Sequence, residues 1–279
     1  MAFAVRLEYS RQIPTLAPNE EGDPVIKAAF FDIDGTLLSF ETHAMPESTK
    51  RALDRMRESG IKTVISSGRP PYQLPPSIRE GFDAYITLNG QLCYDSDGVF
   101  RSCPIAEDDV RTIVDQVRAG LYDVLVLQRS RAFANRLSQR IVTNAREVGL
   151  EYQQDDIACA FDEPVYQFCA YVEPGEEHLI TDATHSVAHT RWTHLFCDVI
   201  PRSGGKNFGV KAVLERFGIA PEEAVAFGDG ENDLAMFESV GTSVAMGNAW
   251  DSVKERATLV TSHVDDDGIY RACERLGII

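Results

Sequence analysis

The chain has 279 residues, enough for one large domain or two moderate ones, and its 44% apolar and 25% charged residues are typical of an ordinary soluble globular protein. Its net charge of −16 disfavours a nucleic-acid partner, because proteins that bind nucleic acid usually present a basic face. No apolar run approaches the roughly 20 residues that a membrane-spanning helix needs. We therefore expect no nucleic-acid or membrane partner, and no obligate protein partner is evident.

Residues 1–24 mix charged residues with prolines and lack the apolar segment of a signal peptide. We expect a short extension before the fold and a cytoplasmic location. The six cysteines include no C-x-x-C pair, which predicts buried free thiols in a reducing compartment rather than a zinc site or a redox dithiol. His185 and His189 have no third ligand nearby in the sequence, so surface or packing roles are favoured.

The first part of the chain alternates between strands and a helix. Val25–Phe31 is almost entirely apolar, as expected for a parallel strand that is covered on both faces. A helix is expected after Pro46, with Gly60 at its end, and strands are expected at Ile61–Ser67 and Tyr85–Leu88. This order predicts an α/β fold with a doubly wound, Rossmann-like parallel sheet.

The pattern changes after residue 90. A hairpin is expected around Asp95–Gly98, and it is followed by helices and strands in a mixed α+β order. The strand–helix alternation then resumes with an apolar strand at Ala224–Phe227. We therefore expect a core formed by residues 25–90 and 192–279, with residues 91–191 inserted as a smaller α+β domain.

Acidic side chains follow two of the expected core strands. Asp32 and Asp34 come directly after the first strand, and Asp229, Asn232 and Asp233 come after a later one. Side chains at strand ends in an α/β sheet point into the crevice where ligands bind. Each cluster alone is compatible with an ordinary turn, and an EF-hand is excluded because the glycine after the first two acids is at the fourth position rather than the sixth. Two such clusters together favour a Mg²⁺ site that also accepts a phosphate, because Mg²⁺ prefers oxygen ligands.

Lys206 and the segment Ser66–Arg69 are candidate contacts to a phosphate. Lys206 stands at the expected start of a helix, where a lysine is electrostatically unfavourable unless an anion lies nearby. Its surroundings resemble a Walker A loop only weakly, and a solvated lysine is the alternative. The hydroxyls and backbone amides of Ser66–Arg69 can bind phosphate oxygens, with an ordinary turn before Pro70 as the alternative.

Taken together, these segments resemble the four motifs of the haloacid dehalogenase-like (HAD) hydrolases, and within them the Cof-type sugar phosphatases that carry a large α/β cap. The four segments are, in chain order, Asp32-x-Asp34-Gly35-Thr36-Leu37, Ser67-Gly68-Arg69, Lys206 and Gly228-Asp229-x-x-Asn232-Asp233. The expected insert falls between the second and third of them, where this subfamily carries its cap. The resemblance thus implies a HAD-like catalytic core and a cap, residues 91–191, that determines substrate specificity.

The resemblance also implies roles for the acidic residues. Asp32 would be the nucleophile that attacks phosphorus, and Asp34 would protonate the leaving alkoxide and later activate water. Asp32, the main-chain carbonyl of Asp34 and Asp229 would hold Mg²⁺. Asp233 would ligate the ion directly or through water.

A phosphate-binding set follows from the same resemblance. Ser67, Gly68, Lys206 and Asn232 would hold or orient the phosphoryl group. Ser66 remains an alternative to Ser67, because adjacent strand residues face opposite sides of a sheet.

The implied activity is Mg²⁺-dependent hydrolysis of a small phosphomonoester, by the resemblance a sugar (hexose) phosphate, through an aspartyl-phosphate intermediate. The partner is then a small phosphorylated metabolite. A phosphomutase or phosphotransferase with the same chemistry, and a non-catalytic sensor of a phosphorylated ligand, stay open as alternatives. The sequence also leaves open whether Asn89, where the core passes into the insert, contacts the substrate or only forms a turn.

Overall fold

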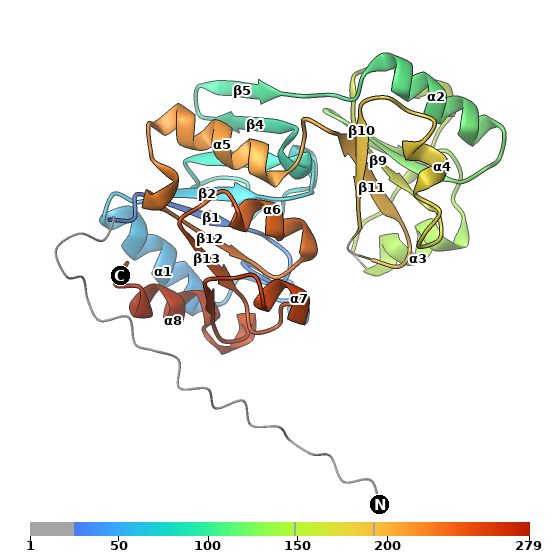
Figure 1. Cartoon of the computed structure of the whole chain (residues 1–279). Helices are drawn as coiled ribbons and strands as arrows, with labels where there is room; N and C mark the ends of the chain where they lie inside the picture. Colours follow the sequence, from blue (N-terminus) through green and yellow to red (C-terminus); the bar gives the residue numbers. More distant parts are fainter. Residues whose placement is uncertain (1–24, 148, 192) are drawn as a thin grey trace, which may run out of the picture.

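The computed structural model of the chain describes residues 25–147, 149–191 and 193–279, and the expected extension at residues 1–24 lies outside the described part. Two lobes are visible, each with its own β-sheet (Figure 1). The predicted fold class, a parallel-sheet core with an inserted α+β unit, is confirmed. No described helix is long and apolar enough to cross a membrane.

The first lobe contains an eight-stranded sheet in the order β14-β13-β12-β1-β2-β3-β4-β5. Neighbouring strands from β14 to β3 are parallel, whereas β4 and β5 are antiparallel. The strands are β1 (Ala28–Phe31), β2 (Lys62–Ser66), β3 (Ala84–Thr87), β4 (Leu92–Asp95), β5 (Gly98–Ser102), β12 (Ala224–Gly228), β13 (Thr242–Ala245) and β14 (Leu259–Val260).

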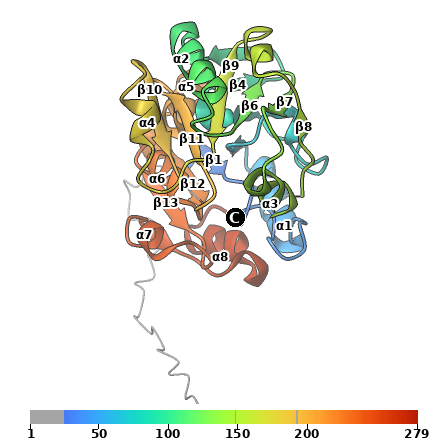
Figure 2. The ribbon, with the colours of Figure 1, turned by 90° about the vertical axis from the view of Figure 1, so that its right-hand side faces the viewer.

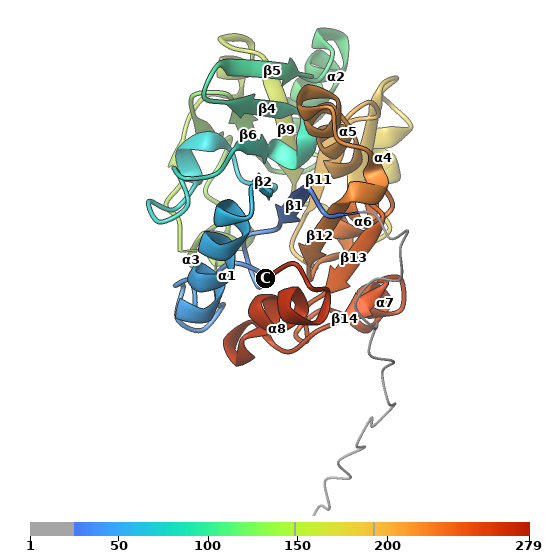
Figure 3. The ribbon, with the colours of Figure 1, turned by 90° about the vertical axis from the view of Figure 1, so that its left-hand side faces the viewer.

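Helices cover both faces of this sheet, as the nearly continuous apolar strands require. Successive residues of β1 point to opposite faces: Phe31 packs with α1 (Glu47–Glu58) and α8 (Gly268–Arg275), and Phe30 packs with helices on the other side (Figure 3). The helices on the Phe30 side are α5 (Lys206–Phe217), α6 (Leu234–Phe237) and α7 (Asp251–Lys254). The strand ends are thereby held rigidly between two helical layers.

The second lobe contains a six-stranded sheet in the order β10-β11-β9-β6-β7-β8, and it faces the viewer in Figure 2. Its strands are β6 (Val124–Gln128), β7 (Ala132–Ala134), β8 (Gln153–Gln154), β9 (Val165–Ala170), β10 (Val187–Thr190) and β11 (Cys197–Pro201). Side chains of α2 (Glu107–Arg118) and α4 (His178–Thr181) pack on one face of this sheet. The opposite face packs with α3 (Gln139–Glu147) and with two leucines of the first lobe.

Short 3-10 turns complete the described chain: η1 (Pro71–Gln73), η2 (Leu88–Gly90), η3 (Ile157–Phe161), η4 (Pro221–Glu223), η5 (Glu231–Asp233) and η6 (Val264–Asp266). All six cysteines are free thiols, four of them buried and Cys103 and Cys159 partly exposed.

The two sheets do not divide at the expected residues 91 and 191. The β4–β5 hairpin pairs with β3 and so extends the first sheet, although it was expected in the insert. Conversely, β11 lies after residue 191 but pairs with β9 and β10 in the second sheet. The reason is that a hairpin signal is local, whereas the choice of the neighbouring strand depends on tertiary packing.

Candidate active site

The turn after β1 brings two aspartates to the end of the sheet. Asp32 follows the strand directly, and Asp34 lies two residues further along the loop. Gly35 has a φ of 81°, and a Cβ at this position would lie 2.3 Å from Asp229 Oδ2. Glycine is therefore required both by the left-handed backbone and by the close approach of the two loops.

Asp32, Asp229 and Asp233 form a buried carboxylate cluster. One oxygen from each lies within 4.8 Å of the others, and Asp233 is completely inaccessible to solvent. Asp32 and Asp229 meet because β1 and β12 are parallel neighbours, so that their carboxyl ends reach the same edge of the sheet. The acidic residues after the two strands therefore lie together, as the sequence predicted, because the two strands are neighbours in the sheet.

Lys206 lies inside this cluster. It is the first residue of α5, is 1% exposed, and its Nζ is 2.5 Å from both Asp32 Oδ1 and Asp233 Oδ1. The alternative of a solvated lysine is wrong. Although burial opposes it, the carboxylates of Asp233 and Asp32 raise the pKa of Lys206 above its ordinary value, so the ammonium stays charged.

The carboxylates respond to burial in the opposite way. Desolvation raises the pKa of Asp32 well above its ordinary value, and Lys206 opposes this only in part. Desolvation, followed by repulsion from Asp233, raises the pKa of Asp229 to about 7. Both shifts indicate that burial disfavours the charged form of these two carboxylates.

Hydrogen bonds fix the remaining oxygens of the cluster. Asp233 Oδ2 accepts from the backbone N–H groups of Asp229 and Gly230, at 2.9 and 3.0 Å, while its Oδ1 accepts from Lys206. The Thr36 hydroxyl donates to Asp229 Oδ1 at 2.8 Å. Both oxygens of Asp233 are therefore engaged, whereas Asp229 and Asp32 face the cavity.

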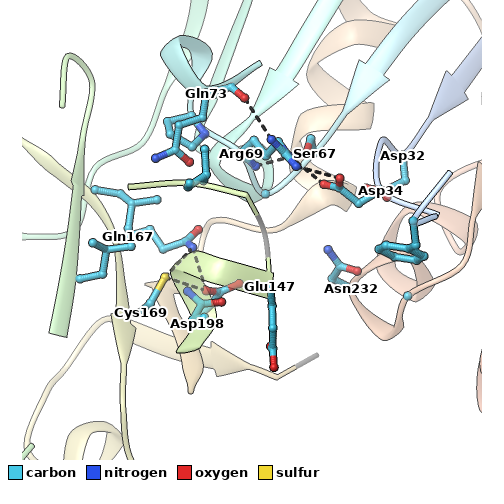
Figure 4. Close-up of a pocket in the computed structure, with 18 of the residues that line it drawn as sticks. Asp32, Asp34, Ser67, Arg69, Gln73, Glu147, Gln167, Cys169, Asp198 and Asn232 are labelled. Carbon is cyan, nitrogen blue, oxygen red and sulfur yellow. Dashed lines mark hydrogen bonds and ion pairs between the residues drawn. The ribbon is translucent and has the colours of Figure 1, made fainter. Parts of the chain in front are cut away.

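Asp34 is turned toward Arg69 rather than toward the cluster. The two side chains form a bidentate ion pair, with Arg69 Nε to Asp34 Oδ2 and Arg69 Nη2 to Asp34 Oδ1 both at 2.8 Å (Figure 4). Arg69 Nη1 also donates to the Gln73 carbonyl at 3.2 Å. Although burial opposes it, the hydrogen bond to Asp34 raises the pKa of Arg69, so the guanidinium stays charged.

A cavity of about 400 Å³ lies between the two sheets, and Asp32, Asp34 and Asp229 form part of its wall. Ser67, Gly68 and Asn232 line the cavity from the first lobe, as a phosphate-binding set requires. Ser66 is fully buried and is absent from the described cavity lining, so the structure places Ser67 at the site. Residues of the second lobe that line the cavity include Leu125, Leu127, Glu147, Tyr152, Gln167 and Asp198.

Comparison with known proteins places this geometry in a family. The family model of the haloacid dehalogenase-like hydrolases matches residues 29–273. The structure of BT1666 from Bacteroides thetaiotaomicron, a phosphatase of the HAD superfamily, superposes with a TM-score of 0.87 at 33% identity, covering 95% of this chain and 100% of that one. The sugar phosphatase BT4131, of HAD subclass IIB, gives a TM-score of 0.84 at 30% identity, covering 91% and 100%.

The chain belongs to the haloacid dehalogenase-like hydrolases, and it is a phosphatase of the Cof type. A relative from Bacillus subtilis, YkrA, is 33% identical over 255 residues, which are 91% of this chain and 98% of that protein. The resemblance seen in the sequence motifs is thereby confirmed along nearly the whole chain.

Some residues of this HAD-like site had no assigned role in the sequence. Arg69 stood in the second motif, but its pairing with Asp34 depends on a contact across 35 residues. Asn248 follows β13 and donates to the Gly35 carbonyl at 2.7 Å. Its position after the end of a third core strand could have indicated from the sequence that it belongs to the site. Gln167 and Asp198 lie on antiparallel strands of the second lobe, where no motif indicates them.

Proposed function

We propose that this HAD-like phosphatase hydrolyses small phosphomonoesters with Mg²⁺, through a covalent phosphate on Asp32. The observation that carries the proposal is the position of Asp32. Its carboxylate lines the cavity, is paired with Lys206, and lies within 4.8 Å of oxygens of Asp229 and Asp233. A nucleophile, a cation and a set of acidic metal ligands thus converge at one end of a ligand-sized space.

The chemistry of the acidic cluster fits Mg²⁺. Every donor in the cluster is a carboxylate oxygen, which is the ligand type that Mg²⁺ prefers over imidazole or thiolate. Asp32 and Asp229 would hold the ion together with the main-chain carbonyl of Asp34. Asp233 would act through water, because Lys206 and two backbone amides already occupy its oxygens. When bound, the ion supplies positive charge that offsets repulsion between the carboxylates and the phosphate.

The reaction then proceeds in two steps on the chain's own residues. Asp32 attacks phosphorus, the bond to the ester oxygen breaks, and Asp34 gives a proton to that oxygen as it leaves as an alcohol. Asp34 next takes a proton from water, which attacks the phosphorus of the aspartyl phosphate and regenerates the Asp32 carboxylate with release of phosphate. Both Asp34 oxygens accept from Arg69 in this structure, so Arg69 must release one of them before each proton transfer.

Ser67, Gly68, Asn232 and Lys206 are the proposed phosphoryl contacts. The first three line the cavity, and the Lys206 ammonium stays positively charged beside the nucleophile. Lys206 therefore offsets negative charge at Asp32, so that an anionic substrate meets less repulsion at the nucleophile despite the net charge of −16.

The substrate class that we propose is a sugar phosphate, with hexose phosphates as the first candidates. BT4131 is described as a sugar phosphatase, and YitU of Bacillus subtilis, 26% identical over 86% of this chain, is named a 5-amino-6-(5-phospho-D-ribitylamino)uracil phosphatase. Both descriptions concern phosphate esters of polyhydroxylated chains or rings. We propose the second lobe as the cap that selects among them, because nine of the 23 described residues that line the cavity belong to it.

The test is phosphate release from a panel of hexose, pentose and ribityl phosphates with and without Mg²⁺. We expect turnover that depends on the ion and is lost in Asp32→Asn, which removes the nucleophile but keeps the shape of the side chain. Isomerised monophosphate with little free phosphate would instead favour a mutase, and ligand-dependent stabilisation without turnover would favour a sensor. A variant Asp32→Asn with unchanged activity would contradict the proposal.

A further inference from the structure

The cavity wall opposite the catalytic aspartates carries a buried cluster of amides and a carboxylate. Gln167 on β9 and Asp198 on β11 line the cavity and are 3% and 2% exposed (Figure 4). Gln167 Nε2 donates to Asp198 Oδ1 at 2.8 Å. The two side chains therefore meet across neighbouring strands, in the wall of the cavity.

Asn89 from the first lobe completes this cluster. Its Nδ2 donates to Gln167 Oε1 at 3.0 Å and to Asp198 Oδ2 at 3.3 Å. The contacts orient the Gln167 amide, with its NH₂ toward Asp198 and its carbonyl toward Asn89. Asn89 has a left-handed backbone, with a φ of 54°, a conformation that asparagine tolerates better than most residues. Asn89 is thus a positioning residue that ties the second sheet to the end of β3.

The surroundings of the cluster are apolar. Leu125, Leu127 and Tyr152 line the same wall, and the hydrogen bonds from Gln167 and Asn89 offset the cost of burying a carboxylate among them. An apolar cavity with a few convergent polar groups is the usual form of a small-molecule site, in which the polar groups determine orientation and specificity. The cluster therefore matches a recognition device better than a structural one.

The charge of this wall restricts the ligand further. Within the described residues that line the cavity from the second lobe, the carboxyl groups are those of Glu147 and Asp198, and lysine, arginine and histidine do not occur. A second phosphate or a carboxylate on the leaving group would meet negative charge there. Hydroxyl and amino groups would instead donate hydrogen bonds to Asp198 and to the Gln167 carbonyl.

We propose that Asp198 and Gln167 recognise hydrogen-bond donors on the leaving group, so that the preferred substrate is a phosphomonoester of a hydroxyl- or amino-bearing molecule without a second anionic group. This inference rests on the proposed phosphatase function and adds to it the residues that select the substrate. It also disfavours a hexose bisphosphate as the ligand.

Three esters test this inference: glucose-6-phosphate, 6-phosphogluconate and p-nitrophenyl phosphate. The first two share a carbon skeleton but differ by one carboxylate, and the third has no donor on its leaving group. We expect wild-type kcat/KM to be at least roughly 10-fold higher for glucose-6-phosphate than for 6-phosphogluconate, because like charges close together disfavour binding. A preference for 6-phosphogluconate would overturn the inference.

The variants Asp198→Asn and Gln167→Leu locate the effect. Each variant removes a hydrogen bond to the leaving group and should lower kcat/KM for glucose-6-phosphate by roughly 10- to 100-fold. For p-nitrophenyl phosphate, kcat/KM should change by about twofold or less. Asp198→Asn should also reduce the discrimination against 6-phosphogluconate. The matched control is Asp182→Asn, which removes an exposed acid of the same lobe and should change none of these values.

Each outcome has a distinct meaning. Equal losses on glucose-6-phosphate and p-nitrophenyl phosphate would assign the cluster a purely structural role and overturn the inference. If wild type hydrolyses p-nitrophenyl phosphate but does not discriminate between the other two esters, the inference fails while the phosphatase function stands. If no ester is hydrolysed, the proposed function fails and this inference fails with it. Should Asp198→Asn not fold, as judged by thermal melting, Gln167→Leu and the wild-type comparison still decide.

Discussion

The buried carboxylate cluster should make the stability of the metal-free protein fall as the pH rises. Asp229 has a pKa of about 7 in the folded protein, against 3.8 as its ordinary value, because burial disfavours its charged form. Between these two values the folded state binds more protons than the unfolded state. The free energy of unfolding therefore decreases as the pH rises from about 4 to 7, and the stabilising proton is fully lost above that range.

The magnitude follows from the size of this shift. A shift of about three pKa units, at 1.36 kcal/mol per unit, corresponds to a loss on the order of 4 kcal/mol from Asp229. Asp32 contributes in the same direction, because its pKa is also raised. Lys206 does not contribute in this range, because its pKa lies above the ordinary lysine value and the ammonium is charged throughout.

The assay is urea unfolding in EDTA at pH 5 and pH 8, on wild type and Asp229→Asn. The asparagine keeps an oxygen to accept from Thr36 but carries no charge, so we expect it to be more stable than wild type at pH 8 and not at pH 5. Asp182→Asn, which removes an exposed acid, is the control that should show no such difference. A stability difference between wild type and Asp229→Asn that is the same at both pH values would refute the reasoning.

Three further outcomes are expected from the same site. Lys206→Met leaves Asp32 and Asp233 without their buried cation and should lower the free energy of unfolding at pH 8 by about 3–5 kcal/mol in urea titrations; a loss below about 1 kcal/mol would show that the ion pairs are dispensable. Asp34→Asn should lower kcat/KM for glucose-6-phosphate by roughly 10²- to 10⁴-fold, and less for p-nitrophenyl phosphate, whose leaving group needs no proton; equal losses of kcat/KM would remove Asp34 from the role of general acid. Chelation with EDTA should abolish phosphate release, and added Mg²⁺ should restore it, whereas activity that persists in EDTA would exclude a required divalent cation.

The catalytic end of the fold was predictable because it depends on local signals. An apolar strand followed directly by acidic residues can be recognised in the sequence. The parallel pairing of β1 with β12 then brings Asp32 and Asp229 to the same edge of the sheet. Lys206 was ambiguous, since a lysine at a helix start is compatible with solvent. Its burial between two carboxylates depends on tertiary packing. One indication of it was present in the sequence, since a lysine at a helix start is unfavourable unless an anion lies nearby.

The boundary and the recognition surface of the second lobe were not predictable in the same way. The β4–β5 hairpin pairs with β3 in the first sheet and β11 pairs with β9 and β10 in the second, and these long-range pairings decide which sheet each one joins. Gln167 and Asp198 are separated by 31 residues, and the antiparallel register of β9 and β11 brings them together. An isolated glutamine and aspartate on apolar strands give no signal that they face a shared cavity.

The measurement that tests the central claim most directly is detection of the phosphorylated enzyme. Asp34→Asn is incubated with Mg²⁺ and p-nitrophenyl phosphate, an ester that can form the covalent intermediate without a general acid, while the loss of Asp34 slows its hydrolysis by water. Intact-mass analysis after acid quench, followed by peptide mapping, is expected to find one phosphoryl group on Asp32 and none in the double variant Asp32→Asn, Asp34→Asn. Release of p-nitrophenol without a covalent phosphate, or a phosphoryl group mapped to another residue, would contradict the account.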